Sequence, residues 1–141
     1  MADPVRRRGL LDTSVVIDLE RIDPLSLPVE VAISAVTLAE LAAGPHATED
    51  PQERARRQDR LQRVEVTFEP LAFDDSAARA YGRIYAAVVT AGRKARGPGV
   101  VDLFIAAVAL ANDLPLYTNN TEDVLHLGGL VEVVAPRRAL H

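Results

Sequence analysis

Four acidic residues in separate parts of the chain each stand where a strand is expected to end or a helix to begin. They are Asp12, Glu40, Asp102 and Asp123. Clustered carboxylates repel one another, and a hard divalent cation such as Mg²⁺ or Mn²⁺, which prefers oxygen ligands, relieves that repulsion. A cation held in this way activates water for attack on a phosphodiester bond. If the four side chains meet, the chemistry they suit is metal-dependent hydrolysis of a phosphodiester.

Each of these acids also has a structural explanation. Asp12 suits the N-cap of a helix, and Glu40 fits a capping box that Thr37 opens. Asp102 and Asp123 fall in the first turns of expected helices, where negative charge interacts favourably with the helix dipole. Taken one at a time, the acids therefore leave a structural role and a chemical role open.

The elements that must position the acids alternate between short apolar strands and helices. Strands are expected up to Asp12 and over residues 29–36, 64–71 (as strand and loop), 114–118 and 130–134. Helices are expected from Thr13 or Ser14, and over residues 37–44, 50–63, about 75–91, 100–112 and 121–127. This alternation predicts an α/β fold with a mostly parallel central sheet and helices on both faces. We find no repeat or linker, so the sequence predicts one domain over residues 1–141.

The expected sheet gives a geometric reason for the acids to converge. In an open parallel sheet, the carboxyl ends of the strands and the amino ends of the following helices share one edge, where ligands bind. Asp12 and Asp123 follow expected strands, and Glu40 and Asp102 begin expected helices. All four side chains are therefore expected at one edge.

Composition narrows the class of protein further. The 141 residues contain no cysteine, which excludes disulfides and thiolate metal sites and fits a reducing cytoplasm. The net charge of −4 argues against a protein that coats nucleic acid by bulk electrostatics. Acidic residues interrupt the apolar stretch after the N-terminal arginines, and the longest apolar run, residues 103–111, is too short to span a bilayer. We therefore expect a cytoplasmic protein with no membrane association.

The segments around the four acids resemble, in order, the motifs of the PIN-domain family. They are residues 11–17 (LDTSVVI), 36–41 (VTLAEL), 101–107 (VDLFIAA) and 117–123 (YTNNTED). The resemblance covers nearly the whole chain and implies a PIN-like three-layer sandwich. Because the chain is compact, it is most similar to the VapC toxins of type II toxin–antitoxin pairs.

This resemblance implies a Mg²⁺- or Mn²⁺-dependent endoribonuclease that acts on RNA, forms a homodimer and is inhibited by a VapB-type antitoxin. Carried over by motif, Asp12 and Asp102 would be the metal ligands, and Glu40 and Asp123 would complete the catalytic pocket. Whether Asp123 or its neighbour Glu122 faces the metal stays open. Motif residues that could hydrogen-bond the acids are Thr13, Ser14, Thr118 and Asn120.

Basic residues are the expected phosphate contacts. Arg93, Lys94 and Arg96 precede the helix of Asp102 and suit the RNA backbone, although a solvated loop is equally consistent. A second basic set, Arg54, Arg56, Arg57, Arg60 and Arg63, lies on the charged helix, where Glu53–Arg57 and Asp59–Arg63 have ion-pair spacing. That helix is expected to be a soluble face or a partner surface. His46, His126 and His141 show no zinc spacing and are interpreted as surface histidines.

Other functions fit the residues less well. Ser14 occupies the position where a haloacid-dehalogenase phosphatase has its second Asp. A response-regulator receiver module requires a Lys at the end of a late strand, and this sequence has none there. No Gly-rich loop with Lys-Ser/Thr is present, which excludes a P-loop NTPase. Two alternatives remain: a catalytically inert PIN-like interaction module, and a nuclease that acts on DNA.

Overall fold

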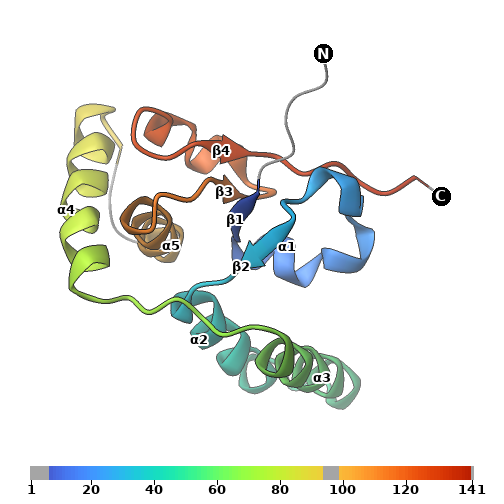
Figure 1. Cartoon of the computed structure of the whole chain (residues 1–141). Coiled ribbons are helices and arrows are strands. Elements are labelled where there is room, and N and C mark those ends of the chain that lie inside the picture. Colours follow the sequence, from blue (N-terminus) through green and yellow to red (C-terminus); the bar gives the residue numbers. More distant parts are fainter. Residues whose placement is uncertain (1–6, 94–98, 141) are drawn as a thin grey trace.

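A four-stranded parallel sheet forms the centre of the protein (Figure 1). The structure is a computed structural model that describes residues 7–93 and 99–140. The strands lie in the order β2-β1-β3-β4, and every neighbouring pair is parallel. Their bounds are β1 (Arg8–Leu11), β2 (Glu30–Ala32), β3 (Leu116–Tyr117) and β4 (Val133–Val134).

Helices connect and cover these strands. In the described residues the α-helices are α1 (Thr13–Ile17), α2 (Ala35–Ala43), α3 (Pro51–Thr67), α4 (Asp75–Thr90) and α5 (Val100–Ala111). Short 3₁₀ turns complete the chain: η1 (Leu19–Arg21), η2 (Pro24–Ser26), η3 (Gly44–Ala47), η4 (Thr121–Asp123) and η5 (Leu125–Leu127). None of the helices within the described ranges has the length and apolar character needed to cross a membrane.

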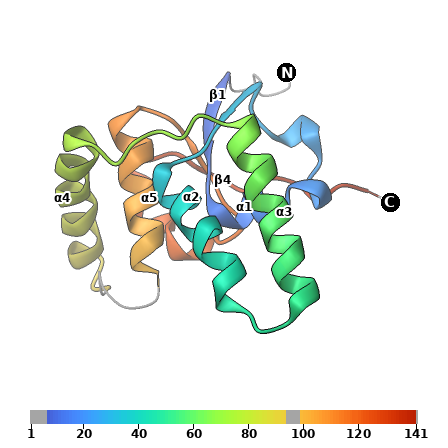
Figure 2. The same cartoon turned by 90° about the horizontal axis from the view of Figure 1, so that it is seen from below.

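The sheet separates two hydrophobic cores, because successive side chains of a strand point to opposite faces. Leu10 and Leu116 pack with residues of α4 and α5 in one core. Leu11 and Tyr117 pack with residues of α1 and α3 in the other. Figure 2 shows α4 and α5 on one side of the sheet and α3 on the other, with α2 between α5 and α3. The predicted α/β class, a parallel sheet covered on both faces, is confirmed.

The expected strand over residues 29–36 is shorter in the structure. Ser34 is the N-cap of α2, and its hydroxyl accepts a hydrogen bond from the Thr37 N–H at 3.0 Å. The helix therefore begins at Ala35, and Thr37 is its third residue. The predicted capping box between Thr37 and Glu40 is wrong, because the cap lies three residues earlier.

Two other expected elements also differ. Residues 64–67 continue α3 instead of forming a strand, because Leu61 and Val64 share one buried helical face. Residues 121–127 form two 3₁₀ turns, η4 and η5, instead of one α-helix. The break falls at Val124, whose buried side chain packs in the core and whose backbone (φ −129°, ψ 4°) is not helical.

Candidate active site

Asp12 lies where β1 ends and is held by hydrogen bonds at both carboxylate oxygens. Its Oδ1 accepts the backbone N–H of Ser14 at 2.7 Å, which makes Asp12 the N-cap of α1, as expected. Its Oδ2 accepts a hydrogen bond from the hydroxyl of Thr118, which directly follows β3. Asp12 is only 4% exposed, so its carboxylate is fixed by two neighbouring strands of the sheet.

Glu40 is held across the gap between α1 and α2. The hydroxyl of Thr13, the first residue of α1, donates a hydrogen bond to Oε1 of Glu40. Oγ1 of Thr13 also lies 3.0 Å from Oγ1 of Thr37, one turn before Glu40 in α2. A buried pair of threonines thus fixes the exposed carboxylate of Glu40 beside the start of α1.

The loop after β3 supports the Asp12 corner. The backbone N–H of Asn120 donates a hydrogen bond to Oγ1 of Thr118 at 3.0 Å. Asn120 thus helps to orient the hydroxyl that donates to Asp12. The Asn119 N–H donates to the Ser14 hydroxyl at 3.1 Å, and the Asn119 side chain donates to Asp18 Oδ2 at 3.2 Å. Sequence reasoning missed Asn119, although its place between two motif residues was a usable signal.

Asp102 lies in the first turn of α5 and is the acid most affected by its surroundings. The helix begins after Gly99, whose positive φ of 96° is accessible to glycine. Burial, together with the negative charges of Asp12, Glu40 and Asp123, raises the pKa of Asp102 to about 6. The fold therefore brings the four acids close enough for their charges to interact.

A cleft of about 270 Å³ opens beside Asp102. Its lining consists of Val88, Arg93, Gly99, Asp102, Leu103, Asp123 and His126. Asp123 borders this cleft, and Glu122, its exposed neighbour, is not part of the lining. The geometry therefore favours Asp123 over Glu122 as the fourth acid.

His126 differs from the surface histidine that the sequence suggested. Both of its ring nitrogens are buried and have no hydrogen-bond partner within the described part of the chain. Burial lowers the pKa of His126, and the positive charge of Arg93 lowers it further. His126 lines the same cleft as Asp123, three residues earlier, and this i,i+3 spacing, which places two side chains on one helical face, was a usable signal. His46 is exposed as expected, and His141 lies outside the described residues.

The donor set suits a divalent cation. Carboxylate oxygens are the ligands that Mg²⁺ and Mn²⁺ prefer, and their mutual repulsion at Asp102 is what such an ion would offset. Within residues 7–93 and 99–140, no three acidic or histidine side chains are already arranged to hold one ion together. Mg²⁺ commonly binds through one or two carboxylates and keeps its remaining waters, so a site with two direct protein ligands fits this geometry.

The two sets of basic residues singled out in the sequence lie in different surroundings. Arg93 borders the cleft, whereas Lys94 and Arg96 lie outside the described residues. On α3, Arg54 and Arg57 donate to backbone carbonyls of the preceding turn, and Arg56 pairs with Glu53 at 2.8 Å. The expected Glu53–Arg57 ion pair is present at 3.4 Å. In this described helix Asp59 and Arg63 form no ion pair, contrary to the spacing argument.

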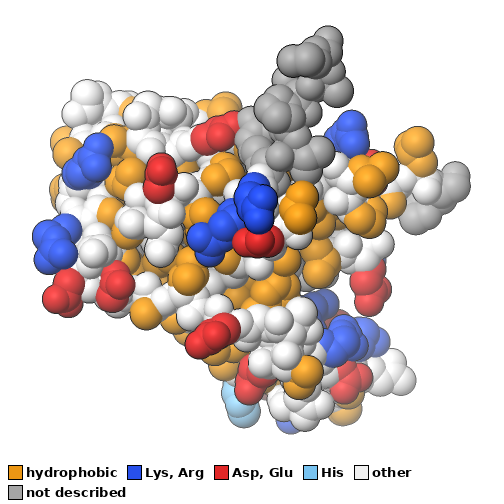
Figure 3. All heavy atoms as spheres, viewed as in Figure 1, with side chains coloured by type: hydrophobic (Ala, Val, Ile, Leu, Met, Phe, Trp, Pro, Cys, Tyr) orange, Lys and Arg blue, Asp and Glu red, His pale blue; other side chains and the backbone are white. Residues whose placement is uncertain are grey.

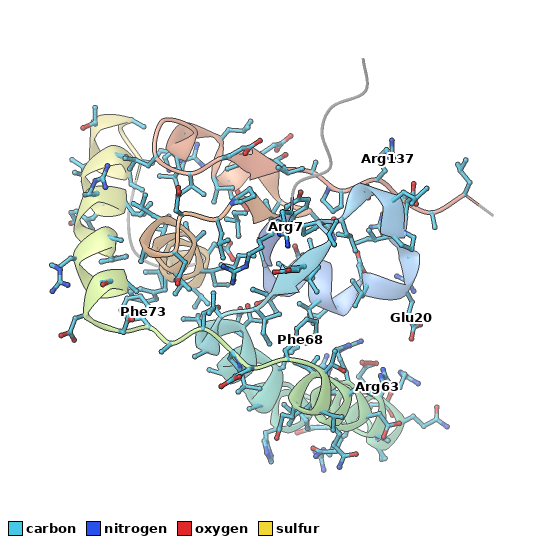
Figure 4. The ribbon with its side chains drawn as sticks, in the orientation of Figure 1. Arg7, Glu20, Arg63, Phe68, Phe73 and Arg137 are labelled. Atoms are coloured by element: carbon cyan, nitrogen blue, oxygen red, sulfur yellow. The ribbon has the colours of Figure 1, made fainter. Side chains whose placement is uncertain are left out.

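A separate groove of about 500 Å³ runs between the second half of α3 and the segment from α1 to η1. Its apolar part includes Val16, Ile17 and Phe68. Arg60 and Arg63 stand on the α3 side, and Glu20 lies across from Arg63 (Figure 4). Basic and hydrophobic side chains lie together at this end of α3 (Figure 3). The groove is thus amphipathic, with most of its positive charge on α3.

The PIN-domain family model matches residues 9–127 of the chain. The chain therefore belongs to the PIN-domain family. It is 39% identical over 128 residues to Ribonuclease VapC5 of Mycobacterium tuberculosis, covering 89% of this chain and 91% of that protein. It is thus a homologue of the VapC ribonucleases of VapBC toxin–antitoxin systems.

Solved structures agree with this assignment. A crystal structure of VapBC-5, a member of the VapBC family of toxin–antitoxin systems from Mycobacterium tuberculosis, matches with a TM-score of 0.79 and 38% identity, covering 93% of this chain and 98% of that chain. The crystal structure of FitAcB from Neisseria gonorrhoeae matches with a TM-score of 0.69 and 28% identity, covering 88% of this chain and 94% of that chain.

Proposed function

We propose that this protein is a metal-dependent endoribonuclease toxin that cleaves RNA in the cytoplasm and is neutralised by a VapB-type antitoxin. Its catalytic residues are Asp12, Glu40, Asp102 and Asp123. One observation carries the proposal: burial and the charges of three acids from distant segments together raise the pKa of Asp102 to about 6. Four interacting carboxylates at the edge of a parallel sheet need a cation, and the homology to a ribonuclease supplies the substrate class.

In this proposal, Asp12 and Asp102 hold Mg²⁺ or Mn²⁺. The bound ion would offset the carboxylate charge, polarise a phosphodiester and activate water for in-line attack. The protein's part is to orient its own acids. Ser14 and Thr118 fix both oxygens of Asp12, and Thr13 fixes Glu40. Asp123 approaches from the cleft side of Asp102 and adds negative charge there.

The test is cleavage of end-labelled single-stranded RNA by the purified protein. We expect cleavage with Mg²⁺ or Mn²⁺ and none with excess EDTA. A DNA oligonucleotide of the same sequence, run in parallel, distinguishes a nuclease that prefers DNA. Absence of metal-dependent cleavage of either polymer, by protein whose fold is verified by circular dichroism, would support the inert interaction module instead.

The antitoxin is the partner that the homology suggests, and the groove beside α3 suits it. The match to VapBC-5, a toxin–antitoxin system, supports such a partner. Arg60 and Arg63 provide positive charge beside apolar floor residues such as Phe68, which fits a segment with alternating acidic and apolar side chains. The double variant Arg60→Glu/Arg63→Glu should weaken antitoxin binding and leave RNA cleavage intact. Unchanged binding would remove the groove from the antitoxin interface.

We also propose a homodimer, which the family resemblance implies. Analytical ultracentrifugation of the toxin without its antitoxin measures this directly. A sedimentation coefficient that corresponds to the 15.2 kDa monomer at all protein concentrations would overturn it.

A further inference from the structure

The cleft beside Asp102 contains two groups that the acidic site does not explain. His126 keeps both ring nitrogens buried and without a hydrogen-bond partner within the described residues. Arg93, whose charge acts on the His126 ring, lines the same cleft, and no hydrogen bond or ion pair to Arg93's side chain is found in the described part of the chain. Buried polar atoms are normally satisfied, so the His126 nitrogens call for a ligand, and the exposed guanidinium of Arg93 beside them is free to bind the same group.

A ligand that binds between Arg93 and His126 must suit the guanidinium and the imidazole at once. A neutral imidazole offers one N–H donor, and a guanidinium offers several donors and a permanent positive charge. An oxygen that carries negative charge meets both requirements, whereas a cation placed directly between Arg93 and His126 would be repelled by the guanidinium. A phosphate oxygen is the anionic group that the site's substrate class provides.

The neighbouring acids set a second condition. Asp102 and Asp123 line the same cleft and would repel a small free anion. A phosphate that belongs to a polymer is different, because the remainder of the chain is held elsewhere at the site. The cleft therefore suits a tethered phosphodiester better than an inorganic ion.

The position of the cleft agrees with this reading. Arg93 follows the end of α4, Gly99 precedes α5, and His126 lies in η5. Figure 2 shows the end of α4 and the beginning of α5 at the same edge of the molecule. A phosphate there would lie immediately beside Asp102, at the acidic site and separate from the groove along α3.

We propose that Arg93 and His126 together bind one backbone phosphate of the RNA, next to the bond that is cleaved. This inference rests on the proposed ribonuclease function and deepens it. The contact positions the strand without reading its sequence, because every nucleotide carries the same phosphate. Arg93 supplies charge and His126 a directed hydrogen bond.

The first experiment measures RNA binding without cleavage. Fluorescence anisotropy with a labelled single-stranded RNA, in EDTA and in an Asp102→Asn background, separates binding from catalysis. Arg93→Gln should weaken binding about tenfold and flatten the slope of log K against log salt by about 0.7. The matched control, Arg83→Gln, changes an exposed arginine on α4 that lies outside the cleft lining, and should leave both unchanged. Equal effects of the two variants would overturn the proposal.

The second experiment separates a ligand-binding role of His126 from a structural one. His126→Leu removes two buried, unpaired nitrogens and should raise the melting temperature of the free protein. The same variant should weaken RNA binding about fivefold. A purely structural residue would shift stability without this opposite change in binding. In ¹H–¹⁵N spectra of the imidazoles, added RNA should move His126 and leave exposed His46 unchanged.

The third experiment tests whether both residues hold the same phosphate. If they do, the double variant Arg93→Gln/His126→Leu should lose less affinity than the product of the two single losses. Fully independent losses would contradict a shared phosphate. If wild-type protein fails to cleave RNA while both variants still weaken RNA binding, the nuclease proposal fails and the phosphate site stands. If the wild-type protein cleaves RNA normally and both variants bind RNA as tightly as it does, the phosphate site fails and the nuclease proposal stands.

Discussion

The two sides of the acidic cluster are built differently. On the side of Asp12, the protein itself satisfies the carboxylate: Ser14 and Thr118 donate to its oxygens, and Thr13 donates to Glu40. On the side of Asp102, Asp123 and His126, the described residues supply no hydrogen bond to any of the three side chains, and burial together with the charges of the other acids raises the pKa of Asp102. The first side is prepared before any ligand arrives. The second side makes no such hydrogen bonds within the described residues, which leaves its groups free for ions and substrate.

The largest expected effect comes from removing the charge at Asp102. Asp102→Asn should lower RNA cleavage by more than about 100-fold, beyond the usual cost of losing a group that merely orients a metal ligand. Asp75→Asn is the matched control, because Asp75 also lies in the first turn of a helix, α4. Both variants should fold, as measured by circular dichroism. Similar activities in the two variants would reduce Asp102 to a helix-dipole role.

The next test removes a hydrogen bond from the side of Asp12. Thr118→Val deletes the hydroxyl that donates to the buried carboxylate of Asp12, which should lower the free energy of unfolding by about 1–3 kcal/mol. Cleavage should also fall about 10- to 100-fold, because Asp12 loses an orienting partner. Thr121→Val, in the following 3₁₀ turn, is the control. Urea denaturation measures the stability change, and an unchanged midpoint for Thr118→Val would show that Asp12 does not depend on this bond.

A smaller effect should distinguish two neighbouring acids on the side of Asp102. Asp123→Asn removes a charge that acts on Asp102 and should reduce cleavage about tenfold. Glu122→Gln removes a neighbouring exposed charge that lies outside the cleft lining and should leave the rate nearly unchanged. The initial rate of RNA cleavage at saturating Mg²⁺ is the measurement. The opposite ranking would transfer the fourth site position to Glu122.

The sequence predicted the prepared side more completely than the other. The end of β1 at an Asp that caps the next helix follows from local residue types, and Thr13 and Thr118 form the hydrogen bonds to the acids that the motif left open beside cap and turn roles. These features depend on short-range geometry, which residue types and strand order largely determine. The same reasoning placed α4 and α5 and the parallel sheet correctly.

The other side depends on features that periodicity does not encode. Residues 121–127 fold as two 3₁₀ turns with the break at buried Val124, and the packing of η5 against α4 accompanies the burial of the His126 ring nitrogens. The predicted beginning of α2 and the predicted end of α3 were also wrong. Ser34 caps α2 earlier than Thr37, and tertiary packing extends α3 to Thr67. Tertiary contacts decided each of these positions.

The smallest predicted effect is the pH dependence of stability without metal. The folded pKa of Asp102 is raised from 3.8 to about 6, so the folded protein binds this proton more tightly than the unfolded chain does. Below pH 3.8 both states are protonated, and the group has no effect. As the pH rises toward 6, the unfolded chain releases the proton first, so the free energy of unfolding falls; above about 6 the decrease is complete. Glu53, whose pKa is lowered chiefly by its hydrogen bond from Arg56, contributes in the opposite direction, and the informative quantity is therefore the difference between wild type and Asp102→Asn in EDTA. The stability of the variant relative to wild type should rise between about pH 4 and 6 and then level off.

Mg²⁺ should reverse this difference at neutral pH, since an ion that binds only the folded protein stabilises it and needs the Asp102 carboxylate. A difference that does not change with pH would mean that neither burial nor the neighbouring charges shift the pKa of Asp102, and the contrast between the two sides of the cluster would no longer hold.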